Sequence, residues 1–113
     1  MLTQLFINGK WENAASGKTF PTTNPATTEI IAPIAEGGAD DIDRAVNAAR
    51  AALEGPWGKM NASERGRIIW KMGERILARA EELAKLETMD NGKTITESSK
   101  IDIPYAADLY FYY

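Results

Sequence analysis

The 113-residue sequence predicts an α/β fold in which strands and turns come first and amphipathic helices follow. Two observations predict this class. Residues 1–36 place turn dipeptides between short segments of alternating polarity, and from residue 39 onward apolar residues recur with helical spacing. Hydrophobic residues make up 44% of the chain and charged residues 26%, which is typical of a globular protein.

The strand region begins with a tight hairpin. Asn8-Gly9 lies between the two arms of "LFINGKWE", and both residues tolerate the positive φ of a type I′ turn. The segments "ASGKTF" and "TTNPATTEI" predict two further turns, and "EIIAPIAE" predicts a strand. Pro33 has no N–H to donate, so this last strand is expected at a sheet edge or at a bulge.

The first helix is predicted from residue 39. Ile42, Val46 and Leu53 fall on one arc, and Asp41 stands in the first turn, where the helix dipole favours an anion. Gly55-Pro56 predicts the end of this helix, with glycine as the cap and proline as the stop.

A second, longer helix is predicted to run without a break from "NASE" to about Met89. Asn61 and Glu64 have the spacing of a capping box at its start. The sequence "DNG" predicts a left-handed residue that closes it. A third helical segment is expected from Thr94, with a break or kink near 102–103 because the residue before Pro104 avoids the α region. Pro104 is then expected in the first turn of a new segment.

The chain ends on four consecutive aromatic residues, from Tyr110 to Tyr113. Such rings offer a large apolar area, so they predict either packing against the two preceding helices or contact with further polypeptide.

Composition narrows the function classes. The chain has no cysteine and no histidine, which removes thiolate nucleophiles, imidazole bases and ordinary zinc sites. The net charge of −3 argues against nucleic acid as a partner. No apolar run has the length of a membrane span and no signal-peptide pattern is present, so neither a membrane partner nor export is expected. The default expectation is a cytoplasmic protein without a catalytic site of its own.

The order of several segments is more specific than any one of them. "FINGKW" is followed by "FPTTNPATTEII", "IAEGGADDIDRAVNAARAAL" and "PWGKMNASERGRII", and then by "LARAEELAKLETMDNGK" and "DIPYAADLYFYY". This series resembles the N-terminal stretch of the aldehyde dehydrogenase superfamily and covers all 113 residues. The resemblance implies the opening part of a Rossmann-type coenzyme domain, with strands and turns in 1–36 and helices in 39–113.

The same resemblance implies the oxidation of an aldehyde to a carboxylic acid with NAD or NADP. The family's nucleophilic cysteine, glutamate base and dinucleotide-binding residues come later than the matching region, so no catalytic or cofactor-binding residue is assigned here. The chain alone is expected to be scaffold, and an aldehyde substrate and a homo-oligomer are expected only for a full-length form. Two alternatives are a non-catalytic structural or interaction module made by truncation, and an unrelated small binding domain.

One site of the family falls within this range. Many relatives bind a monovalent cation, and the matching positions are Thr22, Thr23 and Asp90. Hard cations take oxygen ligands, which carbonyl groups of a turn and a carboxylate supply. The alternative is that Thr22 and Thr23 only form a turn and that Asp90 only ends a helix.

Three other features have both a structural and a functional interpretation. Lys93 is interpreted as a solvated or helix-terminal lysine rather than a catalytic amine. Trp57 and Trp70 are interpreted as packing residues rather than a ligand platform. A basic stripe is interpreted as a solvated face or a contact with another domain rather than a phosphate site; it comprises Arg67, Lys71, Arg75 and Arg79.

Overall fold

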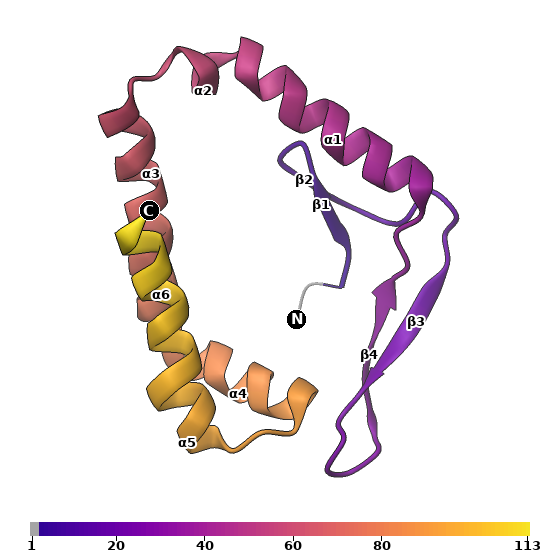
Figure 1. The fold of residues 1–113 in the computed structure, drawn as a ribbon. Coiled ribbons are helices and arrows are strands. Elements are labelled where there is room, and N and C mark those ends of the chain that lie inside the picture. Colours follow the sequence, from indigo (N-terminus) through magenta and orange to yellow (C-terminus); the bar gives the residue numbers. More distant parts are fainter. Residues whose placement is uncertain (1–2) are drawn as a thin grey trace. The chain divides into compact units, whose positions relative to one another are not determined.

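The structure is a computed structural model that describes residues 3–113, and its strands precede its helices as predicted (Figure 1). The described chain divides into two compact units. The first comprises residues 3–23 and 30–60, and the second comprises residues 24–29 and 61–113.

The first unit begins with the predicted hairpin. Strands β1 (Leu5–Ile7) and β2 (Lys10–Glu12) pair antiparallel, and Asn8 and Gly9 have φ of 50° and 76°. Both central residues therefore have the positive φ of a type I′ turn, and this prediction is confirmed. The rings of Phe6 and Trp11 lie across from each other with their centroids 4.8 Å apart.

A second antiparallel ribbon pairs β3 (Thr19–Thr23) with β4 (Ile30–Ala35). Pro21 lies opposite Pro33, so both strands lack a backbone donor at the same level of the ribbon. The predicted edge position of Pro33 is confirmed, because each sheet among the described residues has only two strands.

Helix α1 (Ala39–Glu54) follows β4, and Gly55 ends it in an extended conformation. Pro56 does more than stop the helix, because it is the first residue of the short helix α2 (Pro56–Lys59). Proline suits that position since its missing N–H has no partner there in any case. The apolar arc of α1 is present but not covered: Ile42 and Leu53 are each 62% exposed.

The predicted long helix is wrong as a single element. It consists of α3 (Ala62–Ala78) and α4 (Ala80–Asn91), separated at Arg79, whose φ of −117° and ψ of 21° leave the helical region. No glycine or proline marks this point. The Arg79 guanidinium instead pairs with Glu82 in the first turn of α4, at 2.9 Å and 2.6 Å. The capping box at the start of α3 is confirmed, with Asn61 and Glu64 joined by two hydrogen bonds of 2.8 Å and 3.0 Å.

The break expected before Pro104 is also wrong, whereas the predicted place of Pro104 in the first turn of a new segment is confirmed. Helix α5 (Ile95–Glu97) continues into a π-helix, η1 (Ser98–Asp102), and then into α6 (Ile103–Tyr112). Asp102 and Ile103 both keep right-handed helical angles. The Ile103 N–H donates to the Ser98 carbonyl five residues back, so the wider π turn carries the chain into the proline without a break.

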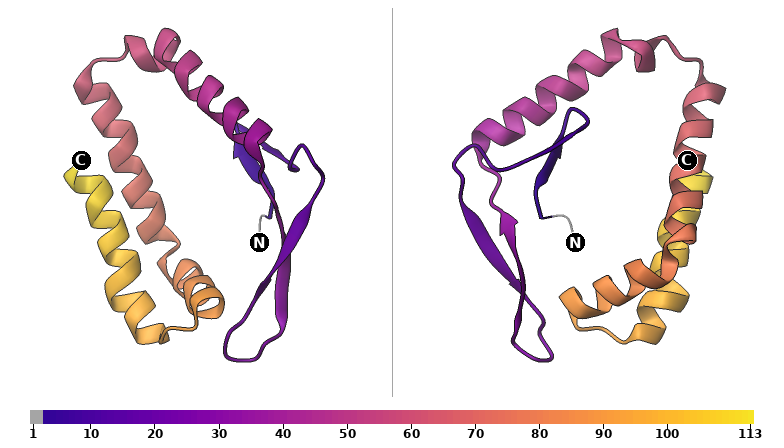
Figure 2. Two further views of the ribbon diagram at one scale, coloured as in Figure 1. Left: turned by 45° about the vertical axis from the view of Figure 1, so that its right-hand side comes forward. Right: turned by 180° about the vertical axis from the view of Figure 1, so that it is seen from behind.

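In the second unit, α6 runs along α3 (Figure 2). The close approach depends on small residues: Gly73 of α3 is buried beneath Phe111, and Ala107 of α6 has no exposed surface. Phe111 also packs on Trp70, with ring centroids 4.4 Å apart. Packing of the terminal aromatics on the preceding helix is therefore confirmed for Phe111, whereas Tyr112 and Tyr113 remain exposed.

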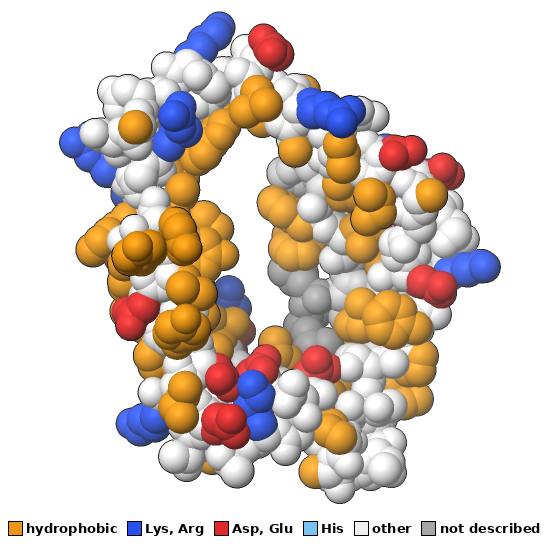
Figure 3. Space-filling view, viewed as in Figure 1, with side chains coloured by type: hydrophobic (Ala, Val, Ile, Leu, Met, Phe, Trp, Pro, Cys, Tyr) orange, Lys and Arg blue, Asp and Glu red, His pale blue; other side chains and the backbone are white. Residues whose placement is uncertain are grey.

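The buried apolar core is small. Among residues 3–113, the buried hydrophobic residues are all alanines, namely Ala14, Ala35, Ala84 and Ala107. Large apolar side chains gather instead on the surface, and Figure 3 shows them over α3 and α6.

Candidate functional site

The predicted cation ligands lie at the ends of two elements. Thr22 and Thr23 are the last residues of β3, where the pairing with β4 has an irregular register. Asp90 is exposed in the last turn of α4. The two threonines belong to the first unit and Asp90 to the second, so the structure describes the two halves of the site separately. The cation site stays a prediction.

The turn after Asp90 has the predicted form of a helix cap. Gly92 is left-handed, with φ of 83° and ψ of 3°, and its N–H donates to the Thr88 carbonyl at 2.9 Å. The position also requires glycine for reasons of space. A β-carbon on Gly92 would lie 2.6 Å from Cγ of Pro25, which sits in the loop 24–29 of the same unit.

Lys93 follows this cap and is held between two carboxylates. Its Nζ lies 2.8 Å from Asp102 Oδ2 and 3.1 Å from Glu87 Oε1. The hydrogen bonds that Lys93 donates to Asp102 and then to Glu87 raise the pKa of Lys93 above its ordinary value. The ammonium is thus stabilised in its charged form, which is the opposite of what a nucleophilic amine needs. Lys93 is helix-terminal, as predicted, but paired rather than merely solvated.

A pair of hydroxyl groups, of which Ser98 is buried and Thr88 half-buried, ties the π-helix to α4. Ser98 has no exposed surface, and the Thr88 hydroxyl donates to its Oγ at 2.9 Å. Thr88, Gly92 and Lys93 also line a shallow hollow of about 400 Å³ in this unit. Thr88 and Ser98 were not predicted from the sequence, because neither belongs to a motif and their contact depends on the π-helical path.

The first unit contains a buried carboxylate with three donors. Asp41, only 3% exposed, accepts hydrogen bonds from the Gly38 N–H at 2.9 Å, the Ala15 N–H at 3.0 Å and the Arg44 guanidinium at 2.6 Å. These bonds, the one from Gly38 above all, hold the pKa of Asp41 below its ordinary value. Asp41 thereby joins the start of α1 to the loop after β2.

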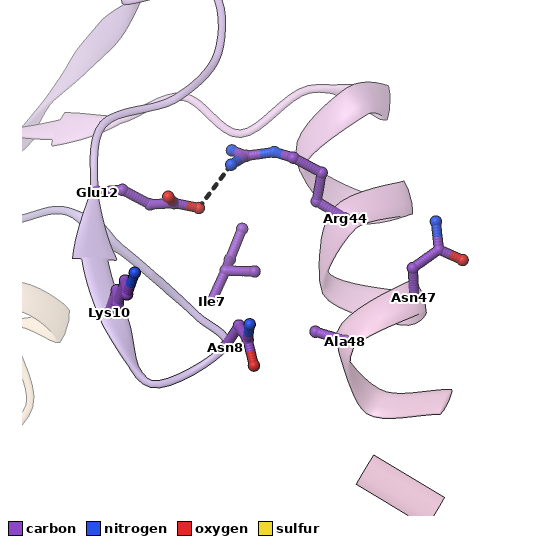
Figure 4. Close-up of a pocket in the computed structure, with 7 residues that line it drawn as sticks. All are labelled: Ile7, Asn8, Lys10, Glu12, Arg44, Asn47 and Ala48. Carbon is purple, nitrogen blue, oxygen red and sulfur yellow. Dashed lines mark hydrogen bonds and ion pairs between the residues drawn. The ribbon is translucent and has the colours of Figure 1, made fainter. Parts of the chain in front are cut away.

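Arg44 also connects α1 to the hairpin, next to the joint that Asp41 makes with the loop after β2. Its second guanidinium nitrogen lies 2.7 Å from Glu12 Oε1, as Figure 4 shows. The pair forms one wall of an open hollow of about 390 Å³. Because two carboxylates already neutralise the guanidinium, the hollow lacks a free arginine for an anion. Its lining residues are Ile7, Asn8, Lys10, Glu12, Arg44, Asn47 and Ala48.

The other residues identified from the sequence are the two tryptophans and the basic stripe, and the structure places some of them in packing contacts or ion pairs. Trp70 packs on Phe111 of α6, as the packing interpretation predicted. Trp57 is half-buried in α2. Of the basic stripe, Arg79 pairs with Glu82 at the junction of α3 and α4.

Comparison with known proteins identifies the family. The model of the aldehyde dehydrogenase family matches residues 11–113 of this chain. The chain belongs to the aldehyde dehydrogenase family. This confirms the resemblance seen in the segment order and rules out the alternative of an unrelated small binding domain.

Two curated relatives illustrate the match. A mitochondrial aldehyde dehydrogenase, family 2 member B4 of Arabidopsis thaliana, is 54% identical over 98% of this chain. A 2-hydroxymuconic semialdehyde dehydrogenase of a Pseudomonas strain is 48% identical over 90% of the chain. In both cases the chain spans 21% of the relative's own length.

Solved aldehyde dehydrogenases share the fold described above. The NAD⁺ complex of the Bacillus cereus enzyme has a TM-score of 0.95 at 43% identity, and PnpE in complex with nicotinamide adenine dinucleotide has 0.94 at 38%. Each likeness covers 99% of this chain and 23% of the solved chain. The strands and helices described here thus correspond to the N-terminal part of aldehyde dehydrogenase structures.

Among the residues that the structure describes, no helix has the length and apolarity needed to cross a membrane.

Proposed function

We propose that this chain forms the N-terminal scaffold of an enzyme that oxidises an aldehyde to a carboxylic acid with NAD or NADP. Two structural relatives that match 99% of the chain were solved with the dinucleotide bound, which supports the cofactor class. The chain contains no cysteine, so a thiolate nucleophile would come from other polypeptide. Its own part is to build and support the domain that holds the cofactor.

The observation that carries the scaffold role is the uncovered apolar surface. The buried hydrophobic residues of the described chain are alanines, while Ile42, Leu53 and Ile101 are all more than half exposed. Exposed apolar surface of this extent is typical of an interface rather than of a finished monomer. We therefore expect these faces to pack against the part of an aldehyde dehydrogenase that follows the matched region.

A chimaera tests this proposal. The matching N-terminal region of the Bacillus cereus aldehyde dehydrogenase is replaced by this chain, and aldehyde-dependent reduction of NAD is followed by absorbance. The chimaera is expected to reduce NAD, and the 113-residue chain alone is expected not to. Reduction of NAD by the chain alone would contradict the scaffold role. An inactive chimaera that folds with the parent's melting temperature would contradict it as well.

The cation is a further part of the proposal. Carbonyl groups of Thr22 and Thr23 and the carboxylate of Asp90 have the oxygen chemistry that a hard cation prefers, and a single carboxylate suits a single positive charge. In the chimaera, Asp90→Asn is expected to remove most of the difference in melting temperature between potassium and a bulky organic cation. The exposed Asp40→Asn is the matched control. Equal salt responses of Asp90→Asn and the parent chimaera would contradict this ligand set.

The remaining partners follow from the same proposal. The full-length enzyme is expected to form a homo-oligomer in the cytoplasm and to bind neither nucleic acid nor membrane. The net charge of −3 supports the expectation that nucleic acid is not a partner. Light scattering of the chimaera measures its oligomeric state. Because several relatives carry mitochondrial names, fractionation of cells that produce the protein is the test of its compartment.

The alternative of a non-catalytic interaction module is favoured by one observation, the close packing of α6 on α3 around Gly73. This function requires the 113-residue chain to fold alone. A cooperative thermal transition and a monodisperse species would support it, and an aggregated chain without a transition would contradict it.

A further inference from the structure

The dipeptide Asn-Gly occurs twice in this chain, at 8–9 and at 91–92, and the structure places the two copies in very different surroundings. Asn-Gly is the dipeptide most prone to spontaneous deamidation, because glycine lets the following backbone nitrogen approach the asparagine side chain. The two copies have the same covalent chemistry. Their local structure therefore decides which one reacts.

From this contrast we propose that Asn8 is a site of spontaneous deamidation and isoaspartate formation, and that Asn91 is protected by its surroundings. The backbone nitrogen of Gly9 attacks Cγ of Asn8 and forms a five-membered succinimide. The Cγ–Nδ2 bond breaks, and ammonia leaves with the proton from the Gly9 nitrogen. Water then opens the ring at either carbonyl and gives aspartate or isoaspartate, without any oxidant or reductant.

The surroundings of Asn8 favour this reaction. Asn8 and Gly9 form a two-residue turn at the exposed tip of a hairpin whose arms are only three residues long. The Phe6 and Trp11 rings contact each other at an angle of 46° across the hairpin, but both are about half exposed, so little buried area is lost when the hairpin opens. Glu12, which pairs with Arg44, lies at the end of the hairpin away from the turn, so this ion pair does not hold the turn residues themselves. The turn therefore samples the rotated backbone that ring closure needs.

The surroundings of Asn91 oppose the same reaction. Asn91 is the last residue of α4, and the attacking nitrogen of Gly92 already donates its proton to the Thr88 carbonyl at 2.9 Å. Pro25 lies against Gly92, and Lys93 is held by two carboxylates next to it. Opening this turn would disturb all of these contacts together, so its free energy of opening is higher.

Deamidation at Asn8 would change the hairpin in two ways. Isoaspartate passes the main chain through the side-chain methylene, which adds an atom to the backbone path of a two-residue turn. The pairing of Ile7 with Lys10 across that turn would then be lost. A new carboxylate would also appear in the hollow that Lys10 and the pair of Glu12 and Arg44 line (Figure 4).

Peptide mapping of the aged chain tests the proposal. The purified chimaera is incubated at mildly alkaline pH and digested with trypsin, which cuts after Lys10, Lys85 and Lys93 of this chain and so separates the two sites. Mass spectrometry then gives the deamidation rate at each site. The same incubation in a high concentration of urea gives the rates without structure, where the two copies are expected to react at similar speed.

Under folding conditions, Asn8 is expected to deamidate at least about tenfold faster than Asn91, which corresponds to a difference of ~1.4 kcal/mol in opening free energy. Equal rates under these conditions, or a faster reaction at Asn91, would overturn the proposal.

Two variants sharpen the test. Asn8→Gly keeps a residue that accepts positive φ and is expected to remove the product at position 8 alone. Lys93→Ala removes the ion pairs that Lys93 makes with Glu87 and Asp102, which we call the clamp beside Asn91-Gly92. It is expected to speed deamidation of Asn91 several-fold while leaving the rate at Asn8 unchanged. Unaltered protection of Asn91 in Lys93→Ala would contradict the part assigned to that clamp.

Discussion

Each of the two units is stabilised internally, and the interactions that stabilise the first differ from those that stabilise the second. In the first unit, the buried carboxylate of Asp41 accepts three hydrogen bonds, and the one from the Ala15 N–H joins the start of α1 to the loop after β2. In the second unit, α6 approaches α3 because Gly73 leaves room for the Phe111 ring. The first joint depends on charge and should respond to pH. The second depends on volume, and should tolerate pH change but not added atoms.

The largest loss of stability is expected at the contact between α3 and α6, where space is limited. A β-carbon at Gly73 would lie 2.5 Å from the Phe111 ring, so Gly73→Ala forces the two helices apart. We expect a loss of about 1–3 kcal/mol in the free energy of unfolding, which is the usual cost of overpacking. Urea denaturation followed by circular dichroism measures it.

Gly66 on the same helix provides the matched control. No atom lies within 4 Å of a β-carbon built there, so Gly66→Ala is expected to stabilise the chain by about 0.5–1 kcal/mol through its better helix propensity. Destabilisation of similar size by both substitutions would show that the α3–α6 packing is not limited by volume.

The next largest effect is expected at the cap of α4. Gly92→Ala places a side chain in a left-handed conformation at a cost of about 1–2 kcal/mol and brings its β-carbon against Pro25. Gly17 also has positive φ but open space around it, so Gly17→Ala isolates the conformational cost. A greater loss of stability for Gly92→Ala than for Gly17→Ala is expected, and equal losses would mean that the Pro25 contact has no energetic weight.

The charge-dependent joint is tested by pH. Because the folded pKa of Asp41 is depressed, its contribution to stability is complete above the ordinary carboxyl pKa and is lost as the pH falls through the lower folded value. Asp41→Asn is expected to lower the melting temperature by several degrees at neutral pH and to flatten its decline below about pH 4. The exposed Asp40→Asn serves as control and should keep the decline. An acid response of Asp41→Asn as steep as the parent's would refute the charge-dependent joint.

The smallest effect is expected at Lys93. Its pKa is raised, so the stability that it contributes is complete at neutral pH and is lost only as the pH rises through the folded value in the alkaline range. Lys93→Met is expected to lower the melting temperature slightly at neutral pH, because partly exposed ion pairs contribute little. Added salt should shrink this difference. A loss of stability larger than that of Gly73→Ala would contradict the expectation that volume, rather than charge, limits the stability of the second unit.

Local sequence signals predicted the helix ends well. The capping box of Asn61 and Glu64 and the left-handed cap at Gly92 both depend on residues within one turn of each other, so the chemistry is readable from adjacent letters. The break at Arg79 and the π-helix were not predictable in this way. Neither carries a local breaker of its own, and the π-helix overrides the usual preference of the residue before Pro104.

The candidate site was also only partly predictable from neighbouring residues in the sequence. Thr22, Thr23 and Asp90 were identified only through the family resemblance, and their role as ligands is a prediction still to be tested. The Asp41 joint was missed because Ala15, one of its donors, lies 26 residues away in sequence. The sequence placed Asp41 correctly in the first turn of a helix, but burial and long-range partners are properties of the folded chain.

The π-helix η1 has a consequence for the evolution of this segment. A π turn accommodates one residue more than the α-helix around it, so deletion of a single residue from 98–102 would allow a regular helix. That deletion would turn α6 by about 100° around its axis relative to α4. Ala107 and Phe111 would then face away from α3, and the groove that Gly73 keeps open would be empty. The extra residue thus fixes the rotation of α6 about its own axis. Insertions or deletions in this stretch should be tolerated only when together they restore that rotation.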